Sequence, residues 1–136
     1  MTIQVLKNRT VGQIKYEFSS EYPYLKLEFF KRPPNNKKTV EIVPDTTVLS
    51  HLQPAMHEGV ITLTGNLKVS ELEKYFKENF LLDVQVFRRS GNLWLETTIT
   101  DKWTLERQNT HGREITESFF NPRLRDFNYD RTNDGF

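Results

Sequence analysis

The sequence contains no cysteine and no apolar stretch near the roughly 20 residues that a membrane-spanning helix needs. Without cysteine there is no disulfide framework, no thiolate-ligated metal centre and no thiol nucleophile. The first nine residues hold no apolar run of the length found in signal peptides. We therefore expect a soluble cytoplasmic protein with no membrane contact, and 136 residues are enough to bury a hydrophobic core.

The chain also has no surplus of charge of either sign. It carries 19 Lys and Arg against 18 Asp and Glu, a formal net charge of +1. Basic and acidic residues number 8 and 6 over residues 1–58, 7 and 7 over residues 59–112, and 4 and 5 over residues 113–136. Nucleic-acid-binding domains usually carry a clear basic excess, so this balance does not favour that function.

Motifs of common catalytic sites are absent as well. None of the six glycines forms a phosphate-binding loop, and no Gly-x-Ser-x-Gly occurs. The histidines, His51, His57 and His111, lack the i, i+3 or i+4 spacing of a helical metal pair. We expect no catalytic residue, no metal and no cofactor. If the protein were an enzyme, His57 and the adjacent Glu58 would be the least poor candidates.

The chain does contain an internal similarity. When residues 3–18 are aligned with residues 61–76, four positions are identical: Ile3/Ile61, Asn8/Asn66, Val11/Val69 and Phe18/Phe76. After one residue is skipped, residues 27–32 align with 84–89, and after another, residues 43–45 align with 99–101. The matched polar residues, which include Arg32/Arg89 and Asp45/Asp101, favour a tandem duplication over shared apolar spacing alone.

Each copy shows the same succession of local patterns. Alternating apolar residues at 3–5 and 61–63 predict strands, and apolar residues three and four apart predict helices after residues 10 and 68. Thr10 with Gln13 and Ser70 with Glu73 fit capping boxes. Further strands are expected at 24–30, 39–43, 81–87 and 93–99. Short helices are expected at 48–52 and 104–108, the second ended by Gly112, with Asp45 and Asp101 as their caps.

These patterns predict an α+β fold built from two tandem β-α-β-β-(short α) repeats. We expect a mainly antiparallel sheet with helices on one face. Residues 1–58 would form the first repeat and residues 59–112 the second, packed on the first. Residues 113–136 would form a C-terminal tail that contains aromatic residues but no periodicity.

Aromatic residues mark one candidate interaction surface. The tail residues Phe119, Phe120, Phe127 and Tyr129 could dock on their own domain or on a neighbouring copy, and we favour the neighbouring copy. Alternation along residues 93–99 places Trp94 on a sheet face, where it is either an exposed interface anchor or covered by helix 69–80. Both possibilities stay open.

Basic residues beside aromatic strands mark a second candidate. They are Lys31, Arg32, Lys37 and Lys38 after the first long strand, and Arg88 and Arg89 at the matching place in the second copy. Such residues could bind single-stranded nucleic acid or another anion, because bases stack on aromatic rings and cations track phosphates. The more ordinary interpretation is that they protect strand ends against aggregation.

Residues 94–98 (WLETT) and 100–106 (TDKWTLE) resemble small bacterial proteins of the Bacteroidetes kind. The resemblance covers roughly the second repeat and implies a cytosolic bacterial protein. No activity is attached to that group, so the resemblance implies no functional residue. We therefore favour a non-enzymatic protein-interaction or self-assembly module, forming a homo-oligomer in which the tail could take part. Nucleic-acid or anion binding is the alternative.

Overall fold

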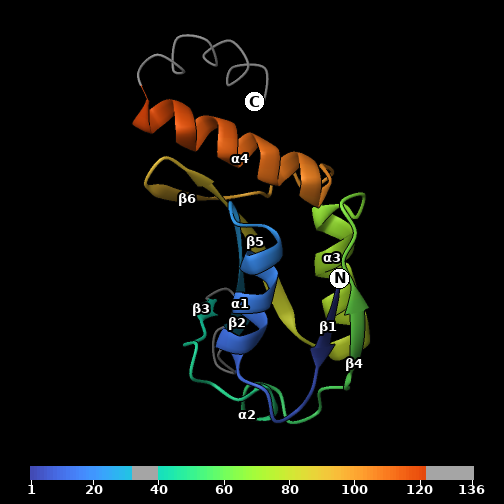
Figure 1. The fold of residues 1–136 in the computed structure, drawn as a ribbon. Helices are drawn as coiled ribbons and strands as arrows, with labels where there is room; N and C mark the ends of the chain where they lie inside the picture. The colour runs from blue at the N-terminus through green and yellow to red at the C-terminus, as the bar shows by residue number, and fades with distance from the viewer. Residues whose placement is uncertain (32–39, 122–136) are drawn as a thin grey trace.

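The structure is a computed structural model that describes residues 1–31 and 40–121. It is an α+β fold with antiparallel sheets, as the sequence predicts (Figure 1). The strands are β1 (Thr2–Val5), β2 (Leu25–Lys31), β3 (Glu41–Ile42), β4 (Gly59–Thr62), β5 (Asp83–Ser90) and β6 (Leu93–Glu96). The helices are α1 (Val11–Glu21), α2 (Leu49–Leu52), α3 (Val69–Tyr75), a π-helical turn that continues it (Phe76–Phe80) and α4 (Leu105–Phe120).

Both sheets take strands from both halves of the chain. β1 pairs with β4, and the larger sheet has the strand order β3-β2-β5-β6. Residues that align with each other in the sequence also pair with each other across the strands: Ile3 lies opposite Ile61 and Glu28 lies opposite Gln85. The two halves are therefore joined through their backbones and not only through side-chain packing.

The hydrophobic core lies on one face of the central strands β2 and β5. Alternation puts Leu25, Leu27 and Phe29 on that face, and the register places Val86 and Val84 opposite the last two. Apolar residues of α1 and α3 complete the core, and they recur at spacings of three and four. They are Val11, Ile14, Phe18, Val69, Leu72 and, in the π-helical turn, Phe76.

One of the two predicted capping boxes is confirmed and the other is wrong. The Thr10 hydroxyl accepts a hydrogen bond from the Gln13 backbone, and the Gln13 side chain accepts one from the Thr10 backbone. In α3 the helix begins at Val69, and the Lys68 N–H donates to Glu71 at 2.9 Å. The helix thus begins before Ser70, the residue that was predicted to cap it. The Val69 N–H donates a hydrogen bond to the Trp103 carbonyl and holds this earlier start in place.

The predicted capping roles of Asp45 and Asp101 are also wrong. Their backbone carbonyls accept hydrogen bonds from the Gly12 and Ser70 N–H groups, at 2.9 and 2.8 Å, so they contact the starts of α1 and α3. α4 is capped instead by the Thr104 hydroxyl, which accepts a hydrogen bond from the next turn. These turns therefore hold the starts of α1 and α3 in place and do not cap α2 and α4, the helices that follow them.

The prediction of a short helix ended by Gly112 is wrong, since α4 continues to Phe120 and includes part of the predicted tail. Gly112 lies inside the helix, where it allows α4 to pack closely on β5. A Cβ at this position would lie 3.0 Å from the Arg88 Cγ and 3.2 Å from the Arg89 carbonyl oxygen. α4 therefore packs closely across one end of the larger sheet, beside β6 (Figure 1).

We predict that Gly112→Ala destabilises the protein by about 1–3 kcal/mol through overpacking against β5. Alanine favours a helix over glycine by about 1 kcal/mol, so propensity alone predicts the opposite sign. Equilibrium unfolding in urea measures the difference, with Arg113→Ala as a control on the exposed side of the same helix. A Gly112→Ala protein as stable as the wild type would contradict the close packing.

Candidate functional site

β6 forms one edge of the larger sheet, with its backbone open on one side. A turn at Gly91 and Asn92 joins it to β5, and the register pairs Ser90 with Leu93 and Arg88 with Leu95. In a hairpin with a two-residue turn, the residue pair next to the turn is hydrogen-bonded, and hydrogen-bonded pairs alternate from there. The backbone N–H and C=O groups of Leu93 and Leu95 therefore bond to β5. The N–H and C=O groups of Trp94 and Glu96 then point to the edge, where no strand of the described residues pairs with them.

The side chains of β6 and the last turn of α4 make this edge apolar. We call Leu93, Trp94, Leu95, Phe119 and Phe120 the β6 surface. All five are exposed, and the exposed fraction reaches 60% for Leu93 and 62% for Phe120. The Phe119 ring lies against Gly91, where a Cβ would approach within 2.8 Å, and it stacks edge-to-face on Phe120 at 5.0 Å. The helix end and the hairpin turn therefore share one surface.

Trp94 lies on the sheet face that also carries Lys26 and Phe87. The Lys26 ammonium lies 5.1 Å from the centre of the Trp94 ring and 5.4 Å from that of Phe87, within range of a cation–π interaction. Lys26 also lies 3.3 Å from a Glu28 carboxylate oxygen. A lysine of β2 thus covers part of Trp94, which keeps 36% of its surface exposed.

The two predicted basic clusters lie far apart. β2 and β5 are antiparallel, with Phe30 opposite Asp83 and Leu25 opposite Arg88. Lys31 and Arg88 are therefore separated by about six residue steps, or roughly 20 Å along the sheet. Arg32, Lys37 and Lys38 lie outside the described residues. Equivalent positions in the two halves thus fall at opposite ends of the paired strands.

Arg88 faces the interior of the protein. Its side chain is 2% exposed, and its Nη1 donates a hydrogen bond to the Gln108 Oε1 at 2.8 Å. Burial lowers the pKa of its guanidinium. Arg89 lies on the other face and donates from its Nε to the Gly91 carbonyl at 2.8 Å. Alternation after Val84 and Val86 could have assigned the inward position to Arg88.

Charges on the Trp94 face are mixed. Lys26 and Arg89 are accompanied by Glu28, Asp83 and Glu96, since all five occupy alternate positions on that face. A face on which the described strands carry no excess of basic groups does not attract a phosphate backbone. This face therefore suits a partner that itself carries both charges.

Sequence reasoning missed Glu73, which it assigned to a helix cap. The Glu73 Oε2 accepts a hydrogen bond at 3.0 Å from the Val86 N–H, just beyond the last paired residues of β5 and β6. The Thr97 hydroxyl donates a hydrogen bond to the Val86 carbonyl at 2.8 Å. The side chains of Glu73 and Thr97 thus satisfy the Val86 backbone groups that a longer β6 would bond. Burial, together with the charge of Asp101, raises the pKa of Glu73 to about 7.

The matching position in the first half carries the opposite charge. Lys15 aligns with Glu73, and its ammonium lies 2.7 Å from Asp45 and 2.5 Å from Glu28. In the second half a carboxyl group occupies this place near Asp101, where the first half has a lysine near Asp45. Burial of this carboxyl group raises the pKa of Glu73 to a value close to neutral pH.

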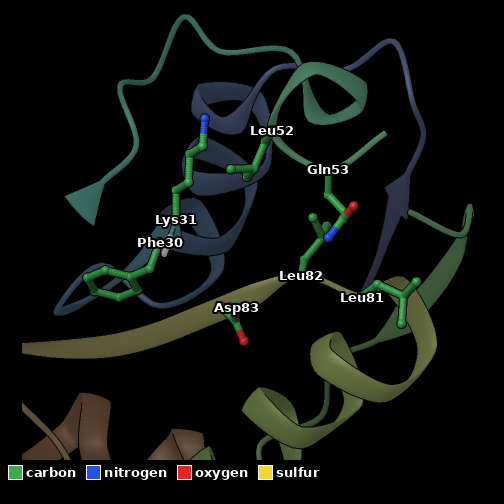
Figure 2. A pocket seen from close by; sticks show the side chains of 7 residues that line it. All are labelled: Phe30, Lys31, Leu52, Gln53, Leu81, Leu82 and Asp83. Atoms are coloured by element: carbon green, nitrogen blue, oxygen red, sulfur yellow. The ribbon is translucent and has the colours of Figure 1, made fainter. Parts of the chain in front are cut away.

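A small pocket lies at the opposite end of the sheet from α4. Figure 2 shows Lys31 and Asp83 extending in opposite directions from it. Its volume is about 220 Å³, below the range of roughly 300–1,000 Å³ typical of ligand sites. Polar groups do not converge in it, so we assign it no ligand. It is lined by Phe30, Lys31, Leu52, Gln53, Leu81, Leu82 and Asp83.

The remaining candidate residues are His57, Glu58, His111, Phe127 and Tyr129. His57 and Glu58 are exposed, and a Glu58 carboxylate oxygen accepts a hydrogen bond from the Lys7 N–H at 2.9 Å. His111 packs edge-to-face on Trp103 at 5.3 Å. Within residues 1–31 and 40–121, no group of three or more His, Asp or Glu is placed to hold a metal ion. Phe127 and Tyr129 lie outside the described residues.

Comparison with known proteins gives no relative for this chain. No family model, no curated protein and no solved structure matches it. The resemblance of residues 94–106 to bacterial proteins therefore stays a prediction. None of the helices in the part of the chain that the structure describes is long and apolar enough to cross a membrane.

Proposed function

We propose that the protein is a non-enzymatic interaction module that assembles with itself through the β6 surface. The observation that carries this proposal is an apolar edge strand whose outward backbone groups have no partner strand among the described residues. Monomeric proteins usually protect such edges with charged residues, especially lysine, with proline, with a bulge or by keeping the strand very short. The four residues of β6, Leu-Trp-Leu-Glu, include no lysine or proline.

The side chains of the β6 surface support the same function. Tryptophan and phenylalanine are enriched in protein interfaces, where they bury large areas at a small cost in side-chain entropy. Trp94, Phe119 and Phe120 are therefore suitable anchors. Phe127 and Tyr129 are proposed as further contacts on the evidence of the sequence alone.

We also propose that the chain arose by tandem duplication of a β-α-β-β-α unit. Matched residues pair with each other at Ile3/Ile61 and at Glu28/Gln85, as expected if a two-fold axis relates the halves. Matched hydrogen bonds support the same origin, since the Val11 N–H donates to residue 47 and the Val69 N–H to residue 103. In this proposal, the two copies of the duplicated unit associate within one chain by antiparallel pairing of their strands.

Self-association is tested by sedimentation velocity of the full chain over about 5–500 μM, the range of weak interfaces. We expect the average mass to rise with concentration, and Leu93→Glu to suppress this rise because it places a charge on the apolar surface. Tyr16→Glu is the matched control, since Tyr16 is an exposed aromatic of α1 outside the β6 surface. A chain that stays monomeric throughout this range would refute self-assembly.

A further inference from the structure

We propose that a second copy of the chain pairs its β6 antiparallel with β6 of the first, with the two-fold axis at Leu95. This inference rests on the proposed function and specifies its partner and register. Trp94 of each copy would exchange both backbone hydrogen bonds with Glu96 of the other, because these residues present N–H and C=O to the open edge. Leu95 would lie opposite the second copy's Leu95.

The pattern of outward backbone groups restricts the symmetric registers. Two β6 strands can bond to each other only if residues whose N–H and C=O point to the open edge lie opposite one another. In a symmetric antiparallel pair, this condition places the two-fold axis at Trp94, Leu95 or Glu96. An axis at Glu96 sets two carboxylates directly opposite each other, which is unfavourable. An axis at Trp94 pairs Glu96 with Asn92, which lies in the turn and not in the strand. The axis at Leu95 uses strand residues only and opposes no like charges.

Charge complementarity favours the same register. Paired residues of antiparallel strands share a sheet face, so the second copy's Glu96 would lie beside Trp94. The Lys26 ammonium already lies 5.1 Å from the centre of that ring. Each copy would therefore bring its Glu96 carboxylate close to a lysine of the other copy, and the two-fold axis repeats the contact.

The pairing would also continue the existing sheet. The order β3-β2-β5-β6 would extend into the second copy, giving a sheet with four strands from each chain. The other edge strand is shorter, since β3 has only two residues, Glu41 and Ile42. The β6 edge is thus the longer and more apolar of the two.

Disulfide trapping tests the register directly, because the natural chain has no cysteine. In full-length Leu95→Cys the two sulfur atoms would face each other across the axis, at a Cα separation of about 4.5–5.5 Å that suits a disulfide. In Leu93→Cys the two Cα atoms would lie about 13 Å apart along the strands, beyond the limit of about 7 Å. Leu93 is the more exposed of the two leucines, so random collision favours the control.

We expect Leu95→Cys to form mostly cross-linked dimer under mild oxidation, as seen on a non-reducing gel, and Leu93→Cys to stay mostly monomeric. If the wild type dimerises in sedimentation but Leu95→Cys does not cross-link above Leu93→Cys, the register is wrong and the proposed function stands. If the wild type is monomeric and neither variant cross-links, both are wrong.

Charge reversal gives an independent measurement. Glu96→Lys should raise the dissociation constant of the dimer at least about tenfold, because it sets two lysines beside each other across the interface. Glu41→Lys is the matched control on the other edge strand and should change the constant less than about twofold. Equal effects of the two variants would overturn the proposed contact between Glu96 and Lys26.

Discussion

Gln108→Leu should lower the free energy of unfolding by about 3 kcal/mol, although it places an apolar side chain at a fully buried position. The Gln108 side chain accepts a hydrogen bond from Arg88 and donates to the Thr100 carbonyl and hydroxyl, all at 2.8 Å. Leucine removes all three bonds at once. Buried polar groups that lose their partners cost about 1–3 kcal/mol each, and more when charged. Denaturant unfolding followed by circular dichroism measures the change.

A double variant separates the lost hydrogen bonds from lost packing. Adding Arg88→Met to Gln108→Leu removes the buried cation together with its acceptor, and part of the stability should return. Replacing a whole buried polar group by apolar side chains is often close to neutral, whereas removing one partner is costly. Glu117→Leu, on the exposed side of α4, is the control. A Gln108→Leu protein within about 0.5 kcal/mol of wild type would show that this contact contributes little.

Glu73→Gln should change how stability depends on pH. The pKa of Glu73 is about 7 in the folded protein against an ordinary value of 4.5, so the folded state binds the proton more tightly. The stability linked to this proton is present below about pH 4.5 and is lost as the pH rises through about 7. A shift of this size corresponds to about 3 kcal/mol, which solvent screening of the half-buried carboxyl reduces to about 1–2 kcal/mol.

Glutamine keeps an oxygen that accepts the Val86 N–H bond but does not ionise. Relative to wild type, Glu73→Gln should therefore gain about 1–2 kcal/mol between pH 4.5 and pH 8. Urea unfolding at several pH values gives the profile. Glu78→Gln, at an exposed carboxyl in the following turn, should run parallel to wild type. A constant difference between Glu73→Gln and wild type across this range would mean that the Glu73 proton does not couple to folding.

Much of the fold could be predicted because its core follows simple periodicities. Alternation in β2 and β5, and the spacing of Val11, Ile14 and Phe18 in α1, match the buried positions. The extent of α4 was missed because its buried side is formed by Gln108, Gly112 and Thr116. Such residues give no hydrophobic pattern, and an internal glycine normally indicates a helix end.

The candidate site was less predictable because it depends on how the two halves pair. Alternation correctly placed Trp94 on a sheet face, but only the sheet order shows that β6 lies at the edge. The basic clusters were grouped because they match in sequence, whereas antiparallel pairing separates matched strand ends. Glu73 resembled an ordinary cap because its partner Val86 is distant in sequence and becomes a neighbour only when β5 is in place.

The pairing of strands from the first half with strands from the second half also affects how the chain folds during synthesis. β1 cannot pair until β4 has emerged from the ribosome. The edge of β2 that pairs with β5 likewise stays without its partner until β5, which ends at Ser90, has been synthesised. At typical rates of about 5–20 residues per second, these strands stay unpaired for several seconds. Contacts so distant in sequence also slow folding in general. The nascent first half therefore depends on the second half to cover it, and chaperones that bind exposed strands have time to act.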